Sequence, residues 1–328
     1  MGNTFKVVIT DGRMPHYNHE REILSAIGAE VVMSGVPYGV RDDGTLAAAA
    51  EDADALLVSQ AHIGVEVLDR LKQCRIIVRY GMGVDTLDIL AATARGIMVA
   101  NVTDHCTNEV ADTALAHIMN LARKLTFSDR EVHNGVWSIA NLKPVKRVSQ
   151  QYLGVWGCGR IGRNLARKAA ALGFHVIGYD PYISPDSAER DGVRLCSYEE
   201  FLRLADIVTL HLQLTDQTRG MVNADVFARM KPGAAIVNVS RGQLINETDL
   251  VKAIRSGQIG GAGLDVTARE PIPPNDPLLS LKNVTISAHT AWYSEESNEE
   301  LQIRAAQIVA AALTGKPVPT LLNPQVLI

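Results

Sequence analysis

The chain has 328 residues, 47% of them hydrophobic and 21% charged, so its composition is that of a globular protein and its length predicts about two domains. Its 32 Lys and Arg residues against 36 Asp and Glu give a formal net charge of -4, and no stretch gathers basic residues, which argues against a nucleic acid partner. No apolar run reaches the roughly 18 residues of a membrane span, and the N-terminus turns polar too early for a signal peptide, so we expect a cytoplasmic protein with no membrane partner.

Short β-branched runs alternate with helical patterns along most of the chain, which predicts an α/β fold built on parallel sheets. In the first hundred residues the helical candidates are Glu20–Ile27, Thr86–Ala94 and a short piece at Ala47–Ala50. The strands predicted between them are Lys6–Thr10, Glu30–Ser34, Ala55–Ser59, Arg75–Arg79 and Met98–Asn101.

A connecting helix is predicted over Asn108–Leu125, where apolar residues recur at helical spacing, and an irregular polar stretch, Asn134–Gln151, follows it. A last helix, Glu295–Leu313, comes after all the strands, and the first domain is one plausible place for it to pack. The strands predicted for a second sheet are Leu153–Gly157, His175–Asp180, Ile207–His211, Ala235–Val239, Gly261–Val266 and Val284–Ser287.

A glycine-rich segment lies between a strand and a helix of the second sheet, and Asp180 closes the next strand 18 residues after its last glycine. This context predicts a dinucleotide site in which glycines permit the turn and the helix N-terminus receives the pyrophosphate. Asp180 would bind a ribose with free hydroxyls and repel a 2′-phosphate, so NAD is favoured over NADP. The alternative is a glycine-rich turn without a ligand. The residues of the segment are Gly157, Cys158, Gly159, Arg160, Ile161 and Gly162.

Polar residues directly follow the strands of the second sheet, where ligands bind in open α/β sheets. His289 follows the last strand, and its imidazole suits proton transfer to and from a substrate oxygen during hydride transfer. Glu270 would orient the ring and favour its protonated form, while Arg241 would hold a carboxylate and polarise a carbonyl. Each residue has an alternative when taken singly. His289 is also consistent with a helix cap, Glu270 with an acidic residue before a Pro-rich loop, and Arg241 with a surface ion pair.

The four cysteines, Cys74, Cys106, Cys158 and Cys196, are widely spaced and match no metal-ligand spacing. We therefore expect reduced thiols and no structural metal.

On these motifs the chain resembles the D-isomer-specific 2-hydroxyacid dehydrogenases, a family that includes phosphoglycerate and glyoxylate/hydroxypyruvate enzymes. The resemblance implies that Arg241 binds the substrate carboxylate and carbonyl, that Glu270 pairs with His289, and that His289 exchanges the proton. It also implies that Asp265 meets the nicotinamide carboxamide, that His211 and Thr215 lie along the cofactor with Ser240 beside them, and that Gly81, Met82 and Gly83 offer backbone N–H groups to the substrate. The segments that carry the resemblance are Gly157–Gly162 with Asp180, Val237–Gly242, Gly263–Val266, Glu270-Pro271 and His289.

The family's architecture implies a Rossmann-type cofactor domain, residues 101–288, inserted in a flavodoxin-like substrate domain formed by residues 1–100 and 289–328. Such enzymes usually form homodimers through the cofactor domain.

Within the family the chain is most similar to the C-terminal binding protein branch, on Ile77–Arg79, Tyr179–Tyr182 and His289–Glu295. This likeness implies that Trp292 packs on the side chain of a 2-keto acid and that Arg79 touches its carboxylate, which suggests an apolar substrate tail. Plain packing is the alternative for Trp292. Met82, Tyr80, Thr86 and Gln213 depart from the pattern, and since no cluster of Lys and Arg is evident near the pocket, we do not expect a phosphorylated substrate.

The sequence therefore predicts an NAD-dependent oxidoreductase that interconverts a small-molecule D-2-hydroxy acid and its 2-keto acid. Formate dehydrogenase shares the fold, but a Gln replaces the Glu partner of the histidine in that family, and Glu270 speaks against it. The alternative from another class is an NAD(H)-sensing, dimerising interaction protein with incidental turnover.

Overall fold

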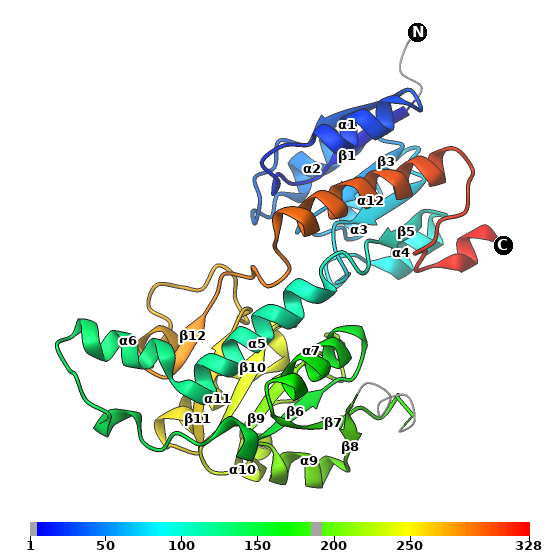
Figure 1. The fold of residues 1–328 in the computed structure, drawn as a ribbon. Coiled ribbons are helices and arrows are strands. Elements are labelled where there is room, and N and C mark those ends of the chain that lie inside the picture. Colours follow the sequence, from blue (N-terminus) through cyan, green and yellow to red (C-terminus); the bar gives the residue numbers. More distant parts are fainter. Residues whose placement is uncertain (1–4, 185–191) are drawn as a thin grey trace. The chain divides into compact units, whose positions relative to one another are not determined.

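The computed structural model describes residues 5–184 and 192–328, which fall into two compact units. The first unit contains the described residues up to Cys106 together with Ser294–Ile328, and the second contains those from Thr107 to Tyr293. Each unit is built on one parallel β-sheet with helices packed against it (Figure 1). The predicted α/β fold class is therefore confirmed.

The first unit has a five-stranded sheet in the order β2-β1-β3-β4-β5, with every neighbouring pair parallel. Its middle strands are apolar on both faces because helices cover both, as parallel sheets require. The strands are β1 (Phe5–Ile9), β2 (Ala29–Met33), β3 (Ala55–Val58), β4 (Ile76–Arg79) and β5 (Met98–Asn101).

Two helix starts in this unit are set by side-chain caps. The helix predicted from Thr86 begins only at Ile89, because the carboxylate of Asp88 accepts a hydrogen bond from Ala91 N at 2.9 Å and so ends the preceding turn. Ser294 caps the last helix in the same way. The helices are α1 (Asn18–Ser25), α2 (Asp43–Ala50), α3 (Val65–Leu68), α4 (Ile89–Ala94) and α12 (Glu295–Leu313).

The C-terminal segment belongs to the first unit by packing and by hydrogen bonds. Helix α12 packs against α1 and β4. Beyond it, the fully buried Asn323 accepts a hydrogen bond from Val99 N at 2.7 Å and donates one to Ile97 O at 2.9 Å. The tail is thereby fixed to the edge strand β5.

The second unit has a seven-stranded sheet in the order β12-β11-β10-β9-β6-β7-β8. The chain runs outward from β6 to β7 and β8, then returns to β9 on the other side of β6, so the strand order reverses between β6 and β9. Ligands of open α/β sheets bind at the carboxyl ends of the strands at this switch point. The strands are β6 (Tyr152–Trp156), β7 (His175–Tyr179), β8 (Arg194–Leu195), β9 (Ile207–Leu210), β10 (Ala234–Asn238), β11 (Ile259–Leu264) and β12 (Val284–Ile286).

The connecting helix differs from its prediction at the C-terminal end. It ends at Arg123 because Lys124 adopts a left-handed backbone with φ of 54°, and a separate helix follows. The irregular stretch predicted next contains two short 3-10 helices, Ala140–Leu142 and Val148–Gln150. The α-helices of this unit are α5 (Thr107–Arg123), α6 (Leu125–His133), α7 (Arg160–Ala171), α9 (Tyr198–Leu204), α10 (Ala224–Arg229) and α11 (Glu247–Arg255).

Aromatic packing holds α9 to the middle of the second sheet. Trp156 and Phe201 are almost completely buried, and their rings meet edge to face with centroids 5.8 Å apart. Gly154 makes this possible, since a Cβ there would lie 2.8 Å from the Phe201 ring. The end of β6, from which the glycine-rich segment leaves, is therefore anchored in the core.

Within residues 5–184 and 192–328, no helix combines the length and the apolar character that a membrane crossing needs. In the same residues, no group of three or more His, Cys, Asp or Glu side chains is arranged as a metal site.

Candidate functional site

The glycine-rich segment connects β6 to α7 at the switch point of the second sheet. Gly157 has φ of 94°, and a Cβ there would lie 2.4 Å from the carbonyl oxygen of His211. A Cβ at Gly162 would lie 2.2 Å from the carbonyl oxygen of Gly157, whereas a Cβ at Gly159 would meet nothing within 4 Å. Two glycines are thus required by the fold, and the third faces open space at the N-terminus of α7, beside Arg160 and Ile161.

Asp180 follows β7 and lies beside this segment. Its carboxylate accepts hydrogen bonds from Cys158 N and from Tyr182 N, both at 2.9 Å. The negative charge is therefore fixed next to the glycine turn, where an adenosine ribose would lie in a dinucleotide site.

The other predicted cofactor residues lie at neighbouring strand ends. Burial lowers the pKa of His211 to about 4, and its ring faces Thr209 Oγ1 at 3.0 Å, so the ring is shielded even though the residue as a whole is half-buried. Ser240 donates a hydrogen bond to Leu210 O at 2.8 Å, which ties β10 to β9. Thr215 lies in the exposed loop that follows β9.

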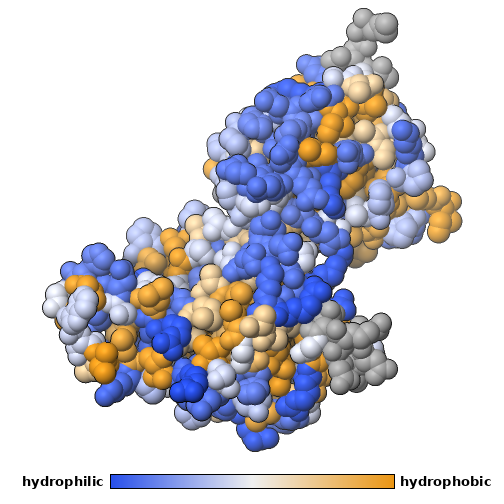
Figure 2. Space-filling view, viewed as in Figure 1, coloured by the Kyte–Doolittle hydropathy of each residue, from blue (hydrophilic) through white to orange (hydrophobic). Residues whose placement is uncertain are grey.

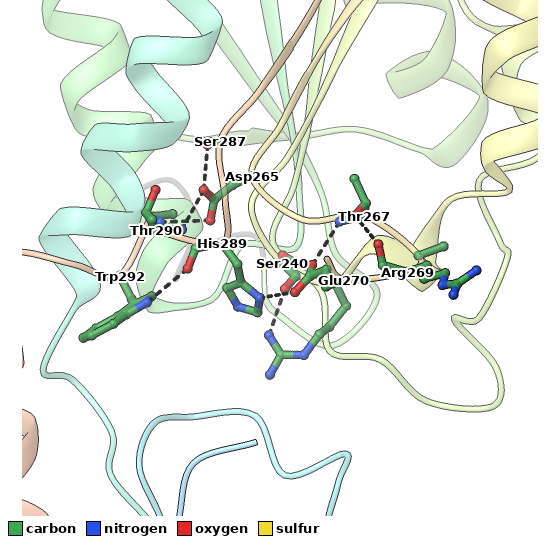
Figure 3. A network of polar contacts seen from close by, with 12 residues as sticks. Ser240, Asp265, Thr267, Arg269, Glu270, Ser287, His289, Thr290 and Trp292 are labelled. Atoms are coloured by element: carbon green, nitrogen blue, oxygen red, sulfur yellow. Dashed lines mark hydrogen bonds and ion pairs between the residues drawn. The ribbon is translucent and has the colours of Figure 1, made fainter. Parts of the chain in front are cut away.

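His289 and Glu270 form an ion pair beyond the neighbouring strands β12 and β11. The distance from His289 Nδ1 to Glu270 Oε2 is 2.7 Å, and the other carboxylate oxygen accepts a hydrogen bond from Thr267 N at 3.0 Å (Figure 3). Since an ionised carboxylate can only accept, the proton lies on Nδ1, and Nε2 remains for a reacting group.

The surroundings keep Glu270 ionised. Burial has the largest single effect and raises the pKa of its carboxyl, but the hydrogen bond and charge of His289, the Thr267 N–H and the charge of Arg241 together lower it by more. The net result is a pKa below the ordinary value. Glu270 therefore places a negative charge beside His289, as a proton-exchanging histidine requires.

Arg241 lies three residues after the end of β10, the next strand in the sheet. Its carbonyl oxygen accepts a hydrogen bond from Asn238 Nδ2 at 2.8 Å, and its Nη1 donates to Ser240 O at 2.9 Å. Arg241, Glu270 and His289 thus come from the ends of three adjacent strands, and the charge of the guanidinium acts on Glu270.

Asp265 is 2% exposed and binds the turn that carries His289. Its carbonyl accepts a hydrogen bond from His289 N at 2.8 Å, and its carboxylate accepts from Thr290 N at 3.0 Å and from Ala291 N at 2.9 Å (Figure 3). The side chain predicted to meet the nicotinamide therefore also holds the backbone of the turn that carries His289.

The predicted substrate residues divide between the units. Arg79 is 5% exposed at the end of β4 and donates a hydrogen bond to Tyr80 O. Met82 and Gly83 follow in the same loop, where Met82 O accepts from Asn101 Nδ2 at 2.9 Å. These three belong to the first unit, whereas Trp292 belongs to the second and donates from Nε1 to His289 O at 3.1 Å.

Three arginines act on one histidine of the first unit. Burial, followed by the charges of Arg304, Arg79 and Arg13, lowers the pKa of His105 to about 4. Arg304 donates a hydrogen bond to Thr103 O at 3.2 Å and also pairs with Glu300. No local sequence pattern indicates this basic group, because its members lie in three distant segments. The expectation of a substrate without a phosphate rested on the apparent absence of such a cluster.

Sequence reasoning missed several residues that support the site. Thr267 and Asn238 fix the backbone around Glu270 and Arg241. Thr267 had no signal beyond its position near a strand end, and Asn238 lies in the segment Val237–Gly242 but was given no role of its own. Ser287 directly follows β12 and donates a hydrogen bond to Asp265 Oδ1 at 2.6 Å. His117 lies on α5 and had no signal at all, since its partners are 168 and 170 residues away.

Residues 115–291 match the family profile described as D-isomer specific 2-hydroxyacid dehydrogenase, NAD binding domain. The chain belongs to this family. A glyoxylate reductase from Korarchaeum cryptofilum is 37% identical over 84% of the chain and 84% of its own length. A D-3-phosphoglycerate dehydrogenase from Mycobacterium leprae is 37% identical over 85% of the chain but only 52% of its own length, so the chain spans about half of that relative.

Solved structures agree with the family's fold. The TT0316 protein from Thermus thermophilus is 31% identical, with a TM-score of 0.84 over 97% of this chain and 99% of that one. A D-lactate dehydrogenase from Aquifex aeolicus has a TM-score of 0.86 over 97% of this chain and 99% of that one, and at 23% identity it shows the fold alone. The family resemblance found in the sequence is therefore confirmed, while the likeness to the C-terminal binding protein branch stays a prediction.

Proposed function

We propose that the chain is an NAD-dependent oxidoreductase that interconverts a D-2-hydroxy acid and its 2-keto acid. The observation that carries the proposal is the His289–Glu270 pair, 2.7 Å apart at the same sheet edge as the glycine turn. The relatives compared above are named as dehydrogenases and reductases, which supports an enzyme over the NAD(H)-sensing alternative.

The residues of the second unit fit a dinucleotide. Gly159 leaves open space at the N-terminus of a twelve-residue helix, whose free N–H groups and positive dipole suit a pyrophosphate. Asp180 favours NAD over NADP by charge. The bound nicotinamide would supply or accept the hydride, and the protein supplies the proton and the orientation.

In the reducing direction, a doubly protonated His289 gives the Nε2 proton to the oxygen of the substrate carbonyl. Glu270 stabilises the imidazolium through Nδ1–H and keeps Nε2 aimed away from itself. Arg241 stabilises negative charge on the same oxygen and binds the carboxylate through its planar fork. In the oxidising direction, neutral His289 takes the hydroxyl proton.

The substrate contacts from the first unit are proposed on the family resemblance. Backbone N–H groups of Met82 and Gly83 and the guanidinium of Arg79 would bind the substrate carboxylate, and Trp292 would lie beside the substrate tail. We propose accordingly that the first unit, predicted as residues 1–100 with 289–328, is the substrate domain and that the second unit, predicted as residues 101–288, is the cofactor domain; the units as observed change at Cys106 and Ser294.

The test is NADH oxidation with glyoxylate, hydroxypyruvate, pyruvate and longer 2-keto acids. The wild-type protein should reduce at least one of them, and His289→Ala should lower kcat by about 100-fold or more. His175→Ala is the matched control, because His175 is an exposed histidine of the same unit at the opposite ends of the strands. Absence of turnover in the wild type, or equal rates in the wild type and His289→Ala, would contradict the proposal. NADH-dependent association without turnover would favour the sensor.

We further propose that the protein is a cytoplasmic homodimer joined through the second unit. Large apolar side chains are exposed along α6 and the segment after it, including Leu125 at 69%, Trp137 at 89% and Ile139 at 70%. Figure 2 shows apolar residues at the surface in this region. A cavity of about 440 Å³ lies between this segment and the amino ends of β9 to β11, with room for a partner's side chain. A monomer rarely exposes so much apolar surface in one place.

Light scattering tests the dimer. The wild type should have twice the mass of the chain, and Trp137→Glu should shift the protein toward monomer, whereas Tyr182→Glu, also 89% exposed, should not. A monomeric wild type, or a Trp137→Glu protein that dimerises as tightly, would contradict this arrangement.

A further inference from the structure

The turn that carries His289 has a strained backbone that needs support. His289 has φ of 53°, in the left-handed region, which costs about 1–2 kcal/mol for a residue with a side chain. The three N–H groups of His289, Thr290 and Ala291 all point at Asp265. The orientation of the Asp265 carboxylate therefore determines the path of the turn.

A chain of hydrogen bonds reaches this carboxylate from helix α5. Ser287 Oγ lies 2.6 Å from Asp265 Oδ1, His117 Nε2 lies 3.1 Å from Ser287 Oγ, and His117 Nδ1 lies 3.2 Å from Thr285 Oγ1. Thr285 lies in β12 and Ser287 directly follows it. Because they are two residues apart, their side chains face the same side of the strand. Figure 3 shows Ser287, Asp265, Thr290 and His289 in one connected network.

The proton positions along the chain follow from the partners. The single hydroxyl proton of Ser287 goes to the carboxylate of Asp265, which can only accept. Ser287 Oγ must then accept from Nε2–H of His117. In a neutral imidazole Nδ1 is then an acceptor, and the hydroxyl of Thr285 donates to it. Every member has a partner of the right kind when His117 is neutral.

The surroundings of His117 favour this neutral form. Burial lowers the pKa of the imidazole, against the opposing charge of Asp265. Helix α5 approaches β11 closely here, because a Cβ at Gly263 would lie 2.7 Å from the Cβ of His117. The imidazole is thus held between the helix and the strands with its Nε2 directed to Ser287.

Building on the proposed function, we propose that His117 and Ser287 are positioning residues for proton transfer. Through Asp265 they fix the turn that keeps His289 on Glu270, although neither side chain touches a reacting atom.

The first experiment measures steady-state kinetics of His117→Leu and Ser287→Ala with NADH and the keto acid that the wild type reduces best. We expect kcat to fall about tenfold in Ser287→Ala, which removes a hydrogen bond to the charged Asp265, and about threefold to tenfold in His117→Leu, which removes a neutral one. In both variants KM for the keto acid should change less than twofold. The isotope effect on kcat with NADH deuterated at C4 should increase, since the hydride and proton step becomes slower. The double variant should be no slower than the slower single variant, because both break one chain.

Two variants separate positioning from general destabilisation. His117→Gln keeps an N–H that can reach Ser287 and should recover at least half of the lost kcat. Ile118→Val removes a methyl group from the fully buried neighbour on α5 and should lower the Tm without changing kcat. Equal kcat in His117→Leu and Ile118→Val, or no recovery in His117→Gln, would overturn the proposal.

A second measurement stays informative if the wild type reduces no keto acid and the proposed function fails. The NMR chemical shift of the His289 Cε1 proton at fixed pH, assigned by comparison with His289→Ala, reports on the His289–Glu270 pair without turnover. It should change in His117→Leu and Ser287→Ala but not in Ile118→Val. Identical chemical shifts in all three would reject the positioning role independently of catalysis.

Discussion

Replacing Glu270 with Gln tests the central electrostatic argument while keeping the shape of the side chain. The amide oxygen still accepts Nδ1–H of His289 at the position of Oε2, 2.7 Å away, but the negative charge is gone, and an amide nitrogen replaces the oxygen that accepts from Thr267 N. A hydrogen bond to a charged group contributes about 1.5–3 kcal/mol and a neutral one about 0.5–1.5 kcal/mol. The protonated pair therefore loses about 1–1.5 kcal/mol, which corresponds to about one pH unit.

The assay is kcat/KM for keto acid reduction by NADH between pH 5 and 9. In Glu270→Gln the alkaline limb of the profile should move about one unit to lower pH, and the rate at pH 8 should fall about tenfold. Glu247→Gln is the control, since Glu247 accepts from Ala268 N at 2.6 Å and has no contact with His289 among the hydrogen bonds of the described residues. An unshifted limb in Glu270→Gln, or an equal shift in Glu247→Gln, would refute the assigned role.

The charge of Glu270 should also change the stability of the fold, and the direction of the effect with pH can be worked out. The folded state lowers the pKa of Glu270, so the ionised carboxylate stabilises the fold at pH values above its unfolded pKa. This contribution is lost as the pH falls through the folded pKa. The wild type should therefore have a higher Tm than Glu270→Gln at pH 7, and the two should converge once the pH lies below the folded pKa of Glu270. A difference in Tm that is constant with pH would point to packing instead of charge.

Three further predictions concern the cofactor and the substrate. Gly162→Ala should lose about 2 kcal/mol of unfolding free energy in urea, because its Cβ would meet Gly157 O at 2.2 Å. Gly159→Ala should stay within about 0.5 kcal/mol of the wild type in the same measurement, since its Cβ meets nothing, and should instead raise the Kd for NADH about tenfold. Asp180→Asn should raise the ratio of kcat/KM for NADPH to that for NADH about tenfold, and an unchanged ratio would remove the charge argument for NAD. Arg304→Gln should lower kcat/KM for oxaloacetate about fivefold more than for pyruvate, since its charge belongs to the basic group at His105; equal losses would show that this charge does not act on the second carboxylate.

The fold could be predicted from the sequence where local signals agree. The alternation of strands and helices indicated the two parallel sheets, and the glycine turn was found because its glycines and Asp180 are tied to strand ends in the sequence itself. The end of α5 was predicted less well, since the left-handed Lys124 is neither Gly nor Asn and breaks an otherwise continuous helical pattern. Strand β8 has only two residues, Arg194–Leu195, and is too short for a periodic signal.

Only the site residues that follow the ends of strands could be predicted from the sequence. Arg241, Glu270 and His289 follow apolar runs, and parallel strands bring their carboxyl ends to one edge, so proximity follows from topology. The residues that support these groups could not be predicted in this way, because their partners are distant in the sequence and meet only in the folded structure. His117 reaches Ser287 across 170 residues, and the arginines at positions 13, 79 and 304 approach His105 only in the folded unit.

The residues that support the site differ from those at the strand ends because the folded structure, not the local sequence, brings them together. A strained turn at His289 costs about 1–2 kcal/mol, and a turn of this kind persists only where its surroundings determine it fully. Here the surroundings are one buried carboxylate, Asp265, that accepts from Ser287 and from backbone N–H groups of the turn. Since a buried carboxylate is stable only with all its donors in place, the support of the turn and the geometry of proton transfer depend on the same hydrogen bonds.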